Sequence, residues 1–357
     1  MEEEKKIKVL FETSVLSGGH SARGIGTYGR LLLENLEEYD ELEIFKSSLL
    51  KKEDNIKPDI IHYPFFDLFF DTLPLNPFKN KVVTVHDVIP LIFPKEYKSG
   101  LKGKLKLKKQ KLALKSAAAI ITDSQASKDD IVKHLGISEK KIFVIYLAAN
   151  PNLKSQDEDL INKVKAKNNL PSKYILYVGD INYNKNIPQL IKMMKYIEDT
   201  DIKLVCLGRN FTAQEIPEWK WIETQLALSD VTNRVIFLNN VLTESIDELA
   251  AIYSGALLYI QPSLYEGFGL PILEAMQCRT PVVCSNNSSL IEVGGEVAVF
   301  SEPNAEDFAN KVTDVLNWSK TKRETNIRAA YKWSQNFSWE KTAKETLDVY
   351  KKVLNAK

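Results

Sequence analysis

The chain has 357 residues, of which 44% are hydrophobic and 27% charged, and its formal net charge is +1. These values are ordinary for a soluble globular protein with enough chain for two domains. The three cysteines lack metal-ligand spacing, the polar N-terminus is unlike a signal peptide, and no apolar run approaches the roughly 20 residues of a membrane span. We therefore expect a cytoplasmic protein with reduced cysteines, in which any membrane contact is peripheral and on the inner face.

The first half of the chain alternates segments typical of strands and of helices. An apolar strand at residues 7–11 leads through a glycine-bearing loop, residues 18–26, into an amphipathic helix at about 27–36. Gly24 and Gly26 in this loop are candidates for phosphate contacts through their backbone. Three more apolar strands and a helix follow, at residues 59–62, 81–86, 118–122 and 125–135. This rhythm predicts a parallel sheet covered by helices.

His86 ends the strand at residues 81–86, and Asp87 follows it. At the carboxyl end of such a strand, a histidine ring can hydrogen-bond a sugar hydroxyl while Asp87 or a carbonyl orients its other nitrogen. A structural histidine is the alternative.

Lysines are concentrated in one stretch, with nine of them and a single acidic residue between residues 95 and 115. Within Lys98–Lys115, Leu101, Leu105 and Leu112 share a helical face with lysines around it. A solvated helix face is one interpretation, and binding to an anionic membrane surface is the other. No aromatic residues are interleaved for stacking on bases, so we expect no nucleic-acid partner.

Residues 151–172 are polar and charged, and we place the domain boundary there. Asp157 and Asp159 have the spacing of metal-binding carboxylates, but in this segment we interpret them as solvated charge, and we expect no metal site. The second half then repeats the alternation, with strands expected at 174–179, 203–207, 235–238, 255–260 and 281–284 and helices at 187–197, 212–228 and 244–253.

Lys185 lies between the strand at 174–179 and the following helix. A cation near a helix N-terminus is unfavourable against the helix dipole unless an anion is present, which indicates a diphosphate contact. A lysine that faces solvent is the alternative. Arg209, after the next strand, is a further candidate for phosphate.

Residues 263–276, which read SLYEGFGLPILEAM, connect an apolar strand to a helix. Pro271 fits the first turn of that helix. The loop at its N-terminus, where free N–H groups favour an anion, contains Gly267, Phe268, Gly269 and Leu270. Glu266 and Glu274 would repel phosphate and suit the hydroxyls of a sugar or ribose. The stretch therefore predicts a nucleotide-sugar site.

This motif, followed by Thr280-Pro281-Val282-Val283 and a serine-rich loop at 288–293, resembles the donor-binding segment of the retaining family 4 glycosyltransferases. The resemblance implies an α/β chain of GT-B fold, with two Rossmann-like doubly wound domains that face a central cleft. The acceptor-side domain would cover residues 1–160 and the nucleotide-sugar donor domain 172–336. A C-terminal helix at 337–357 would return to the first domain.

The resemblance also implies roles for single residues. His86 and Glu266 would contact the transferred sugar as catalytic residues, and Glu274 would bind the ribose. The remaining contacts would be Lys185 with the diphosphate, Val241 with the base, Ser289 with phosphate, and the backbone of residues 267–270 with sugar and phosphate. Two positions depart from the family, because Asn184 replaces an arginine and Arg279 a glycine.

The implied function is a retaining hexosyltransferase that requires neither metal nor cofactor. It would move a hexose from a GDP- or UDP-hexose to a hydroxyl of a glycan or lipid-linked acceptor. The pattern looks most like mannosyltransferases of surface-polysaccharide assembly, so we expect mannose first. Two alternatives remain, a GT-B sugar-nucleotide epimerase and a non-catalytic sugar-binding scaffold.

Overall fold

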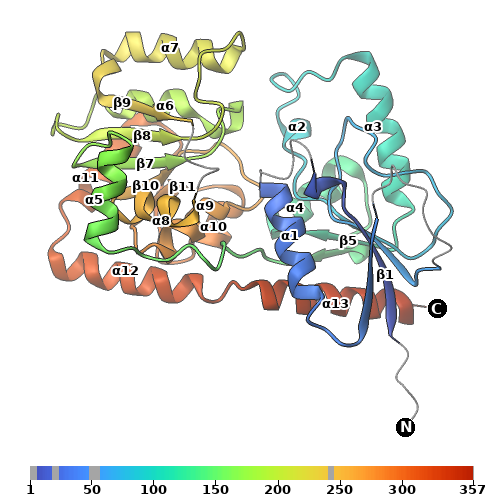
Figure 1. The fold of residues 1–357 in the computed structure, drawn as a ribbon. Helices are drawn as coiled ribbons and strands as arrows, with labels where there is room; N and C mark the ends of the chain where they lie inside the picture. The colour runs from blue at the N-terminus through green and yellow to red at the C-terminus, as the bar shows by residue number, and fades with distance from the viewer. Residues whose placement is uncertain (1–5, 18–23, 48–56, 240–244, 357) are drawn as a thin grey trace. The chain divides into compact units, whose positions relative to one another are not determined.

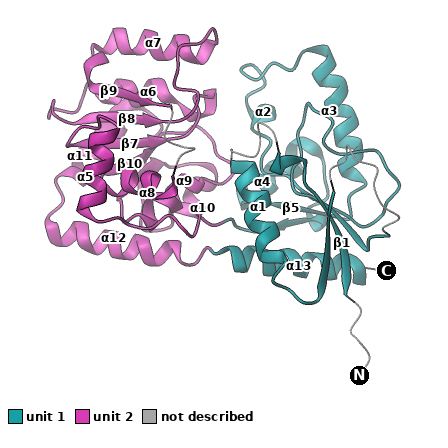
Figure 2. Ribbon diagram, in the orientation of Figure 1, with its two compact units in different colours: residues 1–147, 338–357 teal, residues 148–337 magenta. Residues whose placement is uncertain are grey.

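The computed structural model describes residues 6–17, 24–47, 57–239 and 245–356. The chain forms two compact units, residues 1–147 with 338–357 and residues 148–337 (Figure 2). Each unit is built on a six-stranded parallel sheet with helices packed around it (Figure 1). This architecture confirms the expected α/β fold class.

The first unit has the strand order β2-β1-β3-β4-β5-β6. Its strands are β1 (Ile7–Glu12), β2 (Leu42–Ser47), β3 (Ile60–Tyr63), β4 (Lys81–Thr84), β5 (Ala119–Thr122) and β6 (Ile142–Val144). Its helices are α1 (Gly24–Leu36), α2 (Ile89–Ile92), α3 (Gly100–Lys115), α4 (Gln125–Asp130) and α13 (Trp339–Asn355), with short helical turns at Ser14–Leu16, Ile131–Leu135 and Glu139–Lys141. Strands β2 and β6, which lie at the two edges of this sheet, were not predicted from the sequence. The apolar residues of β2 are interrupted by Glu43 and Lys46, whereas β6 begins the apolar run at residues 142–149 and could have been predicted from it.

The second unit has the strand order β12-β11-β10-β7-β8-β9. Its strands are β7 (Tyr174–Val178), β8 (Lys203–Leu207), β9 (Val235–Leu238), β10 (Leu258–Gln261), β11 (Val282–Ser285) and β12 (Val299–Ser301). Its helices are α5 (Glu158–Lys167), α6 (Ile187–Met193), α7 (Pro217–Ser229), α8 (Ile246–Ser254), α9 (Leu270–Gln277), α10 (Ser288–Gly294), α11 (Ala305–Leu316) and α12 (Lys320–Ser334), with short helical turns at Tyr183–Lys185 and Thr232–Arg234. The strand order reverses between β7 and β10, and in doubly wound sheets ligands bind at the carboxyl ends of the strands at such a point.

The central strands of both sheets are buried on both faces. All residues of β4, β5, β7, β10 and β11 are buried. In the second unit, an apolar cluster joins β7, β8, β10 and β11 to the helices that cover them, and it includes Ile175, Tyr177, Leu204, Ile260 and Val283. A rigid sheet therefore holds the loops that follow its strands.

The expected polar linker at residues 151–172 contains helix α5, which belongs to the second unit. Asp157 caps this helix, because its side chain accepts a hydrogen bond of 2.9 Å from the N–H of Leu160. Ile161 and Val164 are the only buried residues of α5, which is why the segment reads as polar. The division between the units lies at residue 147, earlier than the expected end of the first domain at 160.

Two helix starts also differ from expectation. Helix α1 begins at Gly24, so Gly24 and Gly26 belong to its first turn and not to a loop, which corrects that expectation. Helix α7 begins at Pro217 and not near residue 212. Proline is favoured in the first turn of a helix, where its missing N–H leaves no bond unmade.

Helix α13 belongs to the first unit although its sequence follows the second. Ser338 caps the helix by accepting from the N–H of Lys341 at 3.2 Å. The hydroxyl of Thr342 donates to the carbonyl of Tyr146 at 2.7 Å, and that of Tyr350 lies 2.6 Å from Nδ1 of the buried His62.

None of the helices in the described ranges combines the length and the apolarity that crossing a bilayer requires.

Candidate functional site

The two loops at the switch point of the second sheet meet through an ion pair between Lys185 and Glu266. Lys185 ends a short helical turn after β7, and Glu266 lies in the loop after β10. Nζ of Lys185 lies 2.7 and 2.8 Å from the two carboxylate oxygens. The side chains are only 20% and 8% exposed, so solvent screens this pair little. Two residues that the sequence predicted separately are therefore in contact.

The carboxylate of Glu266 has two further hydrogen bonds, both to the same oxygen. Oε1 accepts from the hydroxyl of Ser263 at 2.6 Å and from the amide of Gln261 at 2.7 Å. Oε2 accepts only from Lys185 among the residues that the structure describes. Because a carboxylate oxygen has room for a second donor, Oε2 can still accept a hydrogen bond from a hydroxyl.

The start of helix α10 fixes the backbone of this loop. The N–H of Glu266 donates to the hydroxyl oxygen of Ser288 at 3.0 Å. The hydroxyl of Ser289 lies 3.0 Å from the carbonyl of Glu266 and 2.8 Å from that of Phe268. Ser289 was expected to contact phosphate, but its buried hydroxyl instead binds the loop, because the turn folds its carbonyls back onto α10.

Gly269 makes the turn into helix α9 possible. Its φ is +109°, in the left-handed region that favours glycine, and an added Cβ would lie 2.9 Å from Leu290. Helix α9 then begins at Leu270 with Pro271 in its first turn. Phe268 is buried and packs against Phe337, with ring centroids 6.1 Å apart. The expected ligand contacts of residues 267–270 can therefore come from backbone N–H groups, and not from the Phe268 ring.

Glu274 lies on α9 and accepts a hydrogen bond of 2.7 Å from the hydroxyl of the buried Tyr253. Burial raises the pKa of Glu274, and the hydrogen bond from Tyr253 opposes this effect only in part. One carboxylate oxygen, Oε1, has no hydrogen bond to any residue in the described ranges. A donor from a ligand would therefore stabilise the charged form.

Asn184, which replaces the family's arginine, is buried and supplies no charge. Its side-chain amide donates to the backbone carbonyl of Tyr265 at 2.9 Å, and its backbone carbonyl accepts from the N–H of Leu264 at 2.7 Å. Asn184 therefore joins the two loops that carry Lys185 and Glu266. Arg209 lies half-buried in the turn after β8.

In the first unit, His86 forms a pair with Asp123, which was not predicted from the sequence. Nδ1 of His86 lies 2.7 Å from Oδ2 of Asp123, and the side chains are 14% and 4% exposed. Asp123 follows β5, which pairs in parallel with β4, so the two residues lie at the same edge of the sheet. Asp123 could have been found as the polar residue after the neighbouring strand. Asp87 or a carbonyl was the partner expected from the sequence.

Burial lowers the pKa of His86, but the charge and the hydrogen bond of Asp123 oppose it, and the charge of Asp87 and the carbonyl of Pro64 act in the same direction as Asp123. Together these effects outweigh burial, so the pKa of His86 is raised. Nε2 of His86 is buried and has no hydrogen-bond partner of good geometry among the described residues. With Nδ1 held by Asp123, Nε2 can donate to a ligand oxygen when the ring is charged.

Three further predicted features remain to be placed. Gly24 and Gly26 begin helix α1, where Gly24 is exposed and Gly26 buried. Val241 lies outside the described residues. Within the described ranges, no group of three or more His, Cys, Asp or Glu side chains is arranged to hold a metal ion.

The structure also explains how Arg279 is accommodated in place of glycine. Arg279 has a φ of +60°, in the left-handed region. Its guanidinium lies 4.9 Å from the ring centroid of Tyr331, in a cation–π contact. The backbone here thus has the geometry that glycine adopts most readily, and the arginine side chain packs on the surface of α12.

Comparisons with known proteins relate both units to sugar transfer. The family described as Glycosyltransferase Family 4 matches residues 28–153, and the family Glycosyl transferases group 1 matches residues 156–333. The O-antigen chain mannosyltransferase RfbU of Salmonella typhimurium is 32% identical over 235 residues, 66% of this chain and 60% of that protein. O-antigen chain mannosyltransferase B of Escherichia coli is 29% identical over 76% of this chain and 70% of its own length. The chain thus spans less than two thirds of the first of these relatives.

Solved structures resemble the whole chain. Sucrose-phosphate synthase from Thermosynechococcus elongatus has a TM-score of 0.73 at 20% identity and is covered over 100% of its length, with 99% of this chain. Anabaena Alr3699/HepE in complex with UDP-glucose has a TM-score of 0.68 at 17% identity, covering 96% of this chain and 99% of that one. At these identities the likeness concerns the fold, and it confirms the GT-B class. Together with the two family matches, it shows that this chain belongs to the family 4 and group 1 glycosyltransferases of GT-B fold.

Proposed function

We propose that this protein is a retaining hexosyltransferase that uses a nucleotide diphosphate sugar as donor and needs no metal or cofactor. The observation that carries the proposal is the buried Lys185–Glu266 pair at the switch point of the second sheet. It places one cation and one carboxylate with an open oxygen beside the N-terminus of α9. Family membership supports the assignment.

Each group of this site has a chemical match in the donor. Oε2 of Glu266 would accept a hydrogen bond from a sugar hydroxyl, and Glu274 from a ribose hydroxyl. Lys185 makes two contacts with the carboxylate, so its third N–H can point to the diphosphate. The backbone N–H groups at the start of α9 would bind a phosphate oxygen. Lys185 and the N-terminus of α9 would thus offset the negative charge of the diphosphate, which in this proposal no metal ion binds.

The proposed reaction breaks the bond between C1 of the hexose and the diphosphate oxygen and forms a bond from C1 to an acceptor hydroxyl oxygen on the same face. The acceptor proton passes to the departing phosphate oxygen, so atoms and charge balance without a protein nucleophile. Stabilisation of the leaving diphosphate by Lys185 would be the main catalytic contribution. We propose that Nε2 of His86 donates a hydrogen bond to a substrate hydroxyl, with Asp123 as its positioning residue.

Mannose from GDP-mannose is the donor that we propose first. The two relatives described above are named as mannosyltransferases, whereas one structural neighbour contains UDP-glucose. We propose that the acceptor is a glycan hydroxyl, free or linked to a lipid.

The test is nucleotide release from GDP-mannose and from UDP-glucose, measured with and without an oligomannoside acceptor. The proposal expects release that depends on the acceptor and gives an α-linked product, since retention preserves the anomeric configuration. Conversion of the donor without acceptor would support the epimerase instead. Failure of both donors to bind or react would support a scaffold.

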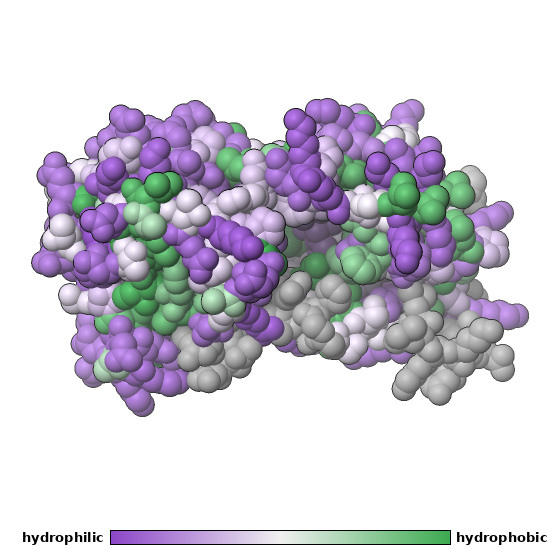
Figure 3. Space-filling view, turned by 90° about the horizontal axis from the view of Figure 1, so that it is seen from above, coloured by the Kyte–Doolittle hydropathy of each residue, from purple (hydrophilic) through white to green (hydrophobic). Residues whose placement is uncertain are grey.

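We also propose that helix α3 binds an anionic membrane surface, which would bring the enzyme to lipid-linked acceptors. Leu101, Leu105 and Leu112 are 82%, 67% and 60% exposed, in a helix that carries seven lysines between residues 102 and 115. Phe70 and Leu75, from the loop bound to α3 through Gln110, are 66% and 55% exposed. Figure 3 shows hydrophobic groups among hydrophilic ones on the surface of this unit.

Co-sedimentation with vesicles tests this surface. Each lysine near an anionic surface contributes about 1 kcal/mol, and the exposed apolar side chains add to it. Binding to vesicles with anionic lipids at low salt is expected to fall at least tenfold in Leu101→Asp/Leu105→Asp. Absence of binding by the intact protein, or equal binding to neutral vesicles, would contradict the proposal.

A further inference from the structure

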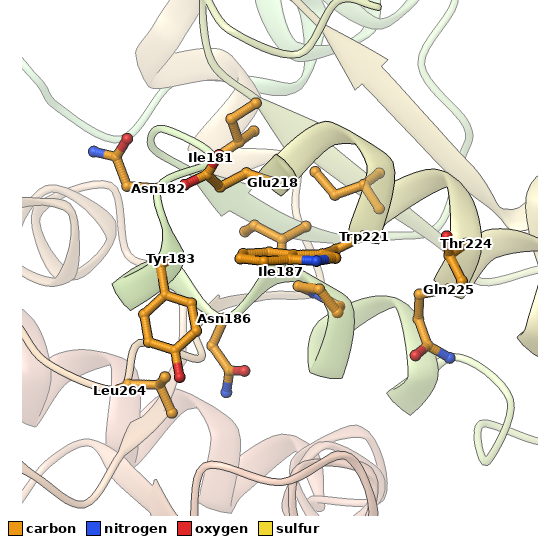
Figure 4. A pocket seen from close by; sticks show the side chains of 12 residues that line it. Ile181, Asn182, Tyr183, Asn186, Ile187, Glu218, Trp221, Thr224, Gln225 and Leu264 are labelled. Atoms are coloured by element: carbon orange, nitrogen blue, oxygen red, sulfur yellow. The ribbon is translucent and has the colours of Figure 1, made fainter. Parts of the chain in front are cut away.

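The second unit contains a pocket of about 320 Å³ that the proposed donor contacts do not use. One wall is the loop and turn after β7 together with the start of α6, residues 181–188. The other wall is a face of α7, and Leu264 closes one end (Figure 4). The volume lies at the lower end of the range for small-molecule sites, roughly 300–1,000 Å³.

An exposed indole forms the centre of this pocket. Trp221 is 43% exposed, although the neighbouring α7 residues Trp219 and Ile222 are buried in the core. Tyr183 meets it at a steep angle, with ring centroids 6.0 Å apart and planes inclined by 72°. Figure 4 shows the indole in the middle of the pocket, with Tyr183 on one side and Thr224 and Gln225 on the other. The indole of Trp221 is thus not part of the hydrophobic core, and its ring can contact a ligand.

Polar groups with unused capacity surround this platform. The side chains of Glu218 and Asn182 and the indole N–H of Trp221 make no hydrogen bond to any other residue in the part of the chain that the structure describes. A carboxylate accepts hydrogen bonds and repels phosphate, so Glu218 favours a neutral ligand rich in hydroxyl groups. An amide can both donate and accept, as pairs of vicinal hydroxyls require.

We propose that this pocket is a saccharide subsite that binds one hexose ring of the glycan acceptor, which places one acceptor contact in the second unit and outside the expected acceptor-side domain. The apolar C–H face of the ring would lie on Trp221, and its hydroxyls would bind Glu218 and Asn182. A nucleobase fits less well, because two rings inclined by 72° cannot enclose a flat base between parallel faces. The inference rests on the proposed function for naming the ligand as the acceptor.

The pocket and the proposed donor site share one short helical turn. Tyr183 and Lys185 belong to one short helical turn, so this turn presents an aromatic ring to the pocket and a cation to Glu266. A glycan held at Trp221 therefore lies beside the loop that holds Lys185. Such a subsite would favour an acceptor that already contains several sugars over a single one.

The test is saturation-transfer NMR with an α-linked mannotriose and no donor, supported by tryptophan fluorescence titration. Trp221→Ala is expected to lose at least five-sixths of the saturation transfer, and Trp221→Phe to retain part of it. The matched control is Tyr196→Ala, because Tyr196 is 44% exposed in the same unit but lines a different cavity. The control is expected to bind like the parent.

In turnover assays, Trp221→Ala should raise the KM for an oligomannoside at least fivefold with little change in the KM for the donor. The inference is wrong if mannotriose does not bind the parent, if Trp221→Ala binds it equally, or if GDP or UDP competes for the same Trp221-dependent signal, which indicates a base site. If the parent never releases nucleotide but binds mannotriose through Trp221, the proposed function fails and the subsite stands. The two failures are thus distinguishable.

Discussion

Replacing Lys185 with methionine tests whether the buried ion pair is energetically real. The change keeps a side chain of similar length and leaves the carboxylate of Glu266 without its counter-charge. Removing one partner of a buried pair typically costs about 3–5 kcal/mol. Here Lys185 is 20% exposed, and Glu266 keeps its hydrogen bonds to Ser263 and Gln261, so we expect a loss of about 2–3 kcal/mol.

The measurement is the melting temperature of the second unit, followed by circular dichroism or calorimetry. A loss of this size lowers the melting temperature by roughly 5–10 °C. Lys173→Met is the matched control, because Lys173 pairs with Asp199 at 3.1 Å while both side chains are 43% or more exposed. An exposed pair contributes little, so the control should change the melting temperature much less than Lys185→Met does.

A double-mutant cycle isolates the pair itself. Lys185→Met combined with Glu266→Gln leaves no buried unpaired charge, so the double variant should be more stable than Lys185→Met alone. We expect a coupling energy of about 1–3 kcal/mol. Equal melting temperatures for Lys185→Met and Lys173→Met, or additive effects in the cycle, would refute the reasoning.

Three further predictions concern other residues. Asp123→Asn should lower the pKa of His86. In the parent, the raised pKa of His86 stabilises the fold at pH below about 6.5, and this stabilisation is lost as the pH rises through the pKa of the folded state. A series of melting temperatures across pH 5–8 should therefore depend less on pH in the variant than in the parent. An unchanged series would show that Asp123 does not set the charge of His86. Glu274→Gln should raise the KM for the donor roughly tenfold, which corresponds to the lower end of the free-energy range for a hydrogen bond to a charged group. The melting temperature should stay the same or rise, because burial already disfavours the charged carboxylate. An unchanged KM would contradict the ribose contact. At position 279, Arg279→Gly should be about 1 kcal/mol more stable than Arg279→Ala, since both lose the contact with Tyr331 but only glycine relieves the φ of +60°; equal melting temperatures would contradict this.

The sequence was sufficient to predict the parallel α/β architecture and the loop that carries Glu266. Apolar strands such as Tyr174–Val178 and the glycine-proline punctuation of residues 267–271 are local signals, and the structure has them where they were expected. The edge strand Leu42–Ser47 and helix α5 escaped because they bury few residues. Local patterns are strong only where burial is strong.

The contacts within the site could not be predicted, because they depend on strand order. Lys185 and Glu266 lie in loops 81 residues apart that become neighbours only because β7 pairs with β10. In the same way, Asp123 reaches His86 because β5 pairs with β4. Asn184 reads as a lost cation in the sequence, and only the packing shows that its amide joins the two loops.

Turnover by Glu266→Gln tests the central claim most directly. Glutamine keeps the shape of the side chain but removes the negative charge and replaces one carboxylate oxygen with an amide group. The proposal assigns Oε2 of Glu266 to a hydrogen bond from a hydroxyl of the transferred sugar. With folding verified by melting temperature, nucleotide release from GDP-mannose in the presence of acceptor should fall about 10²–10³-fold in kcat. A folded Glu266→Gln variant that releases nucleotide as fast as the parent would contradict the assignment of this carboxylate to the sugar.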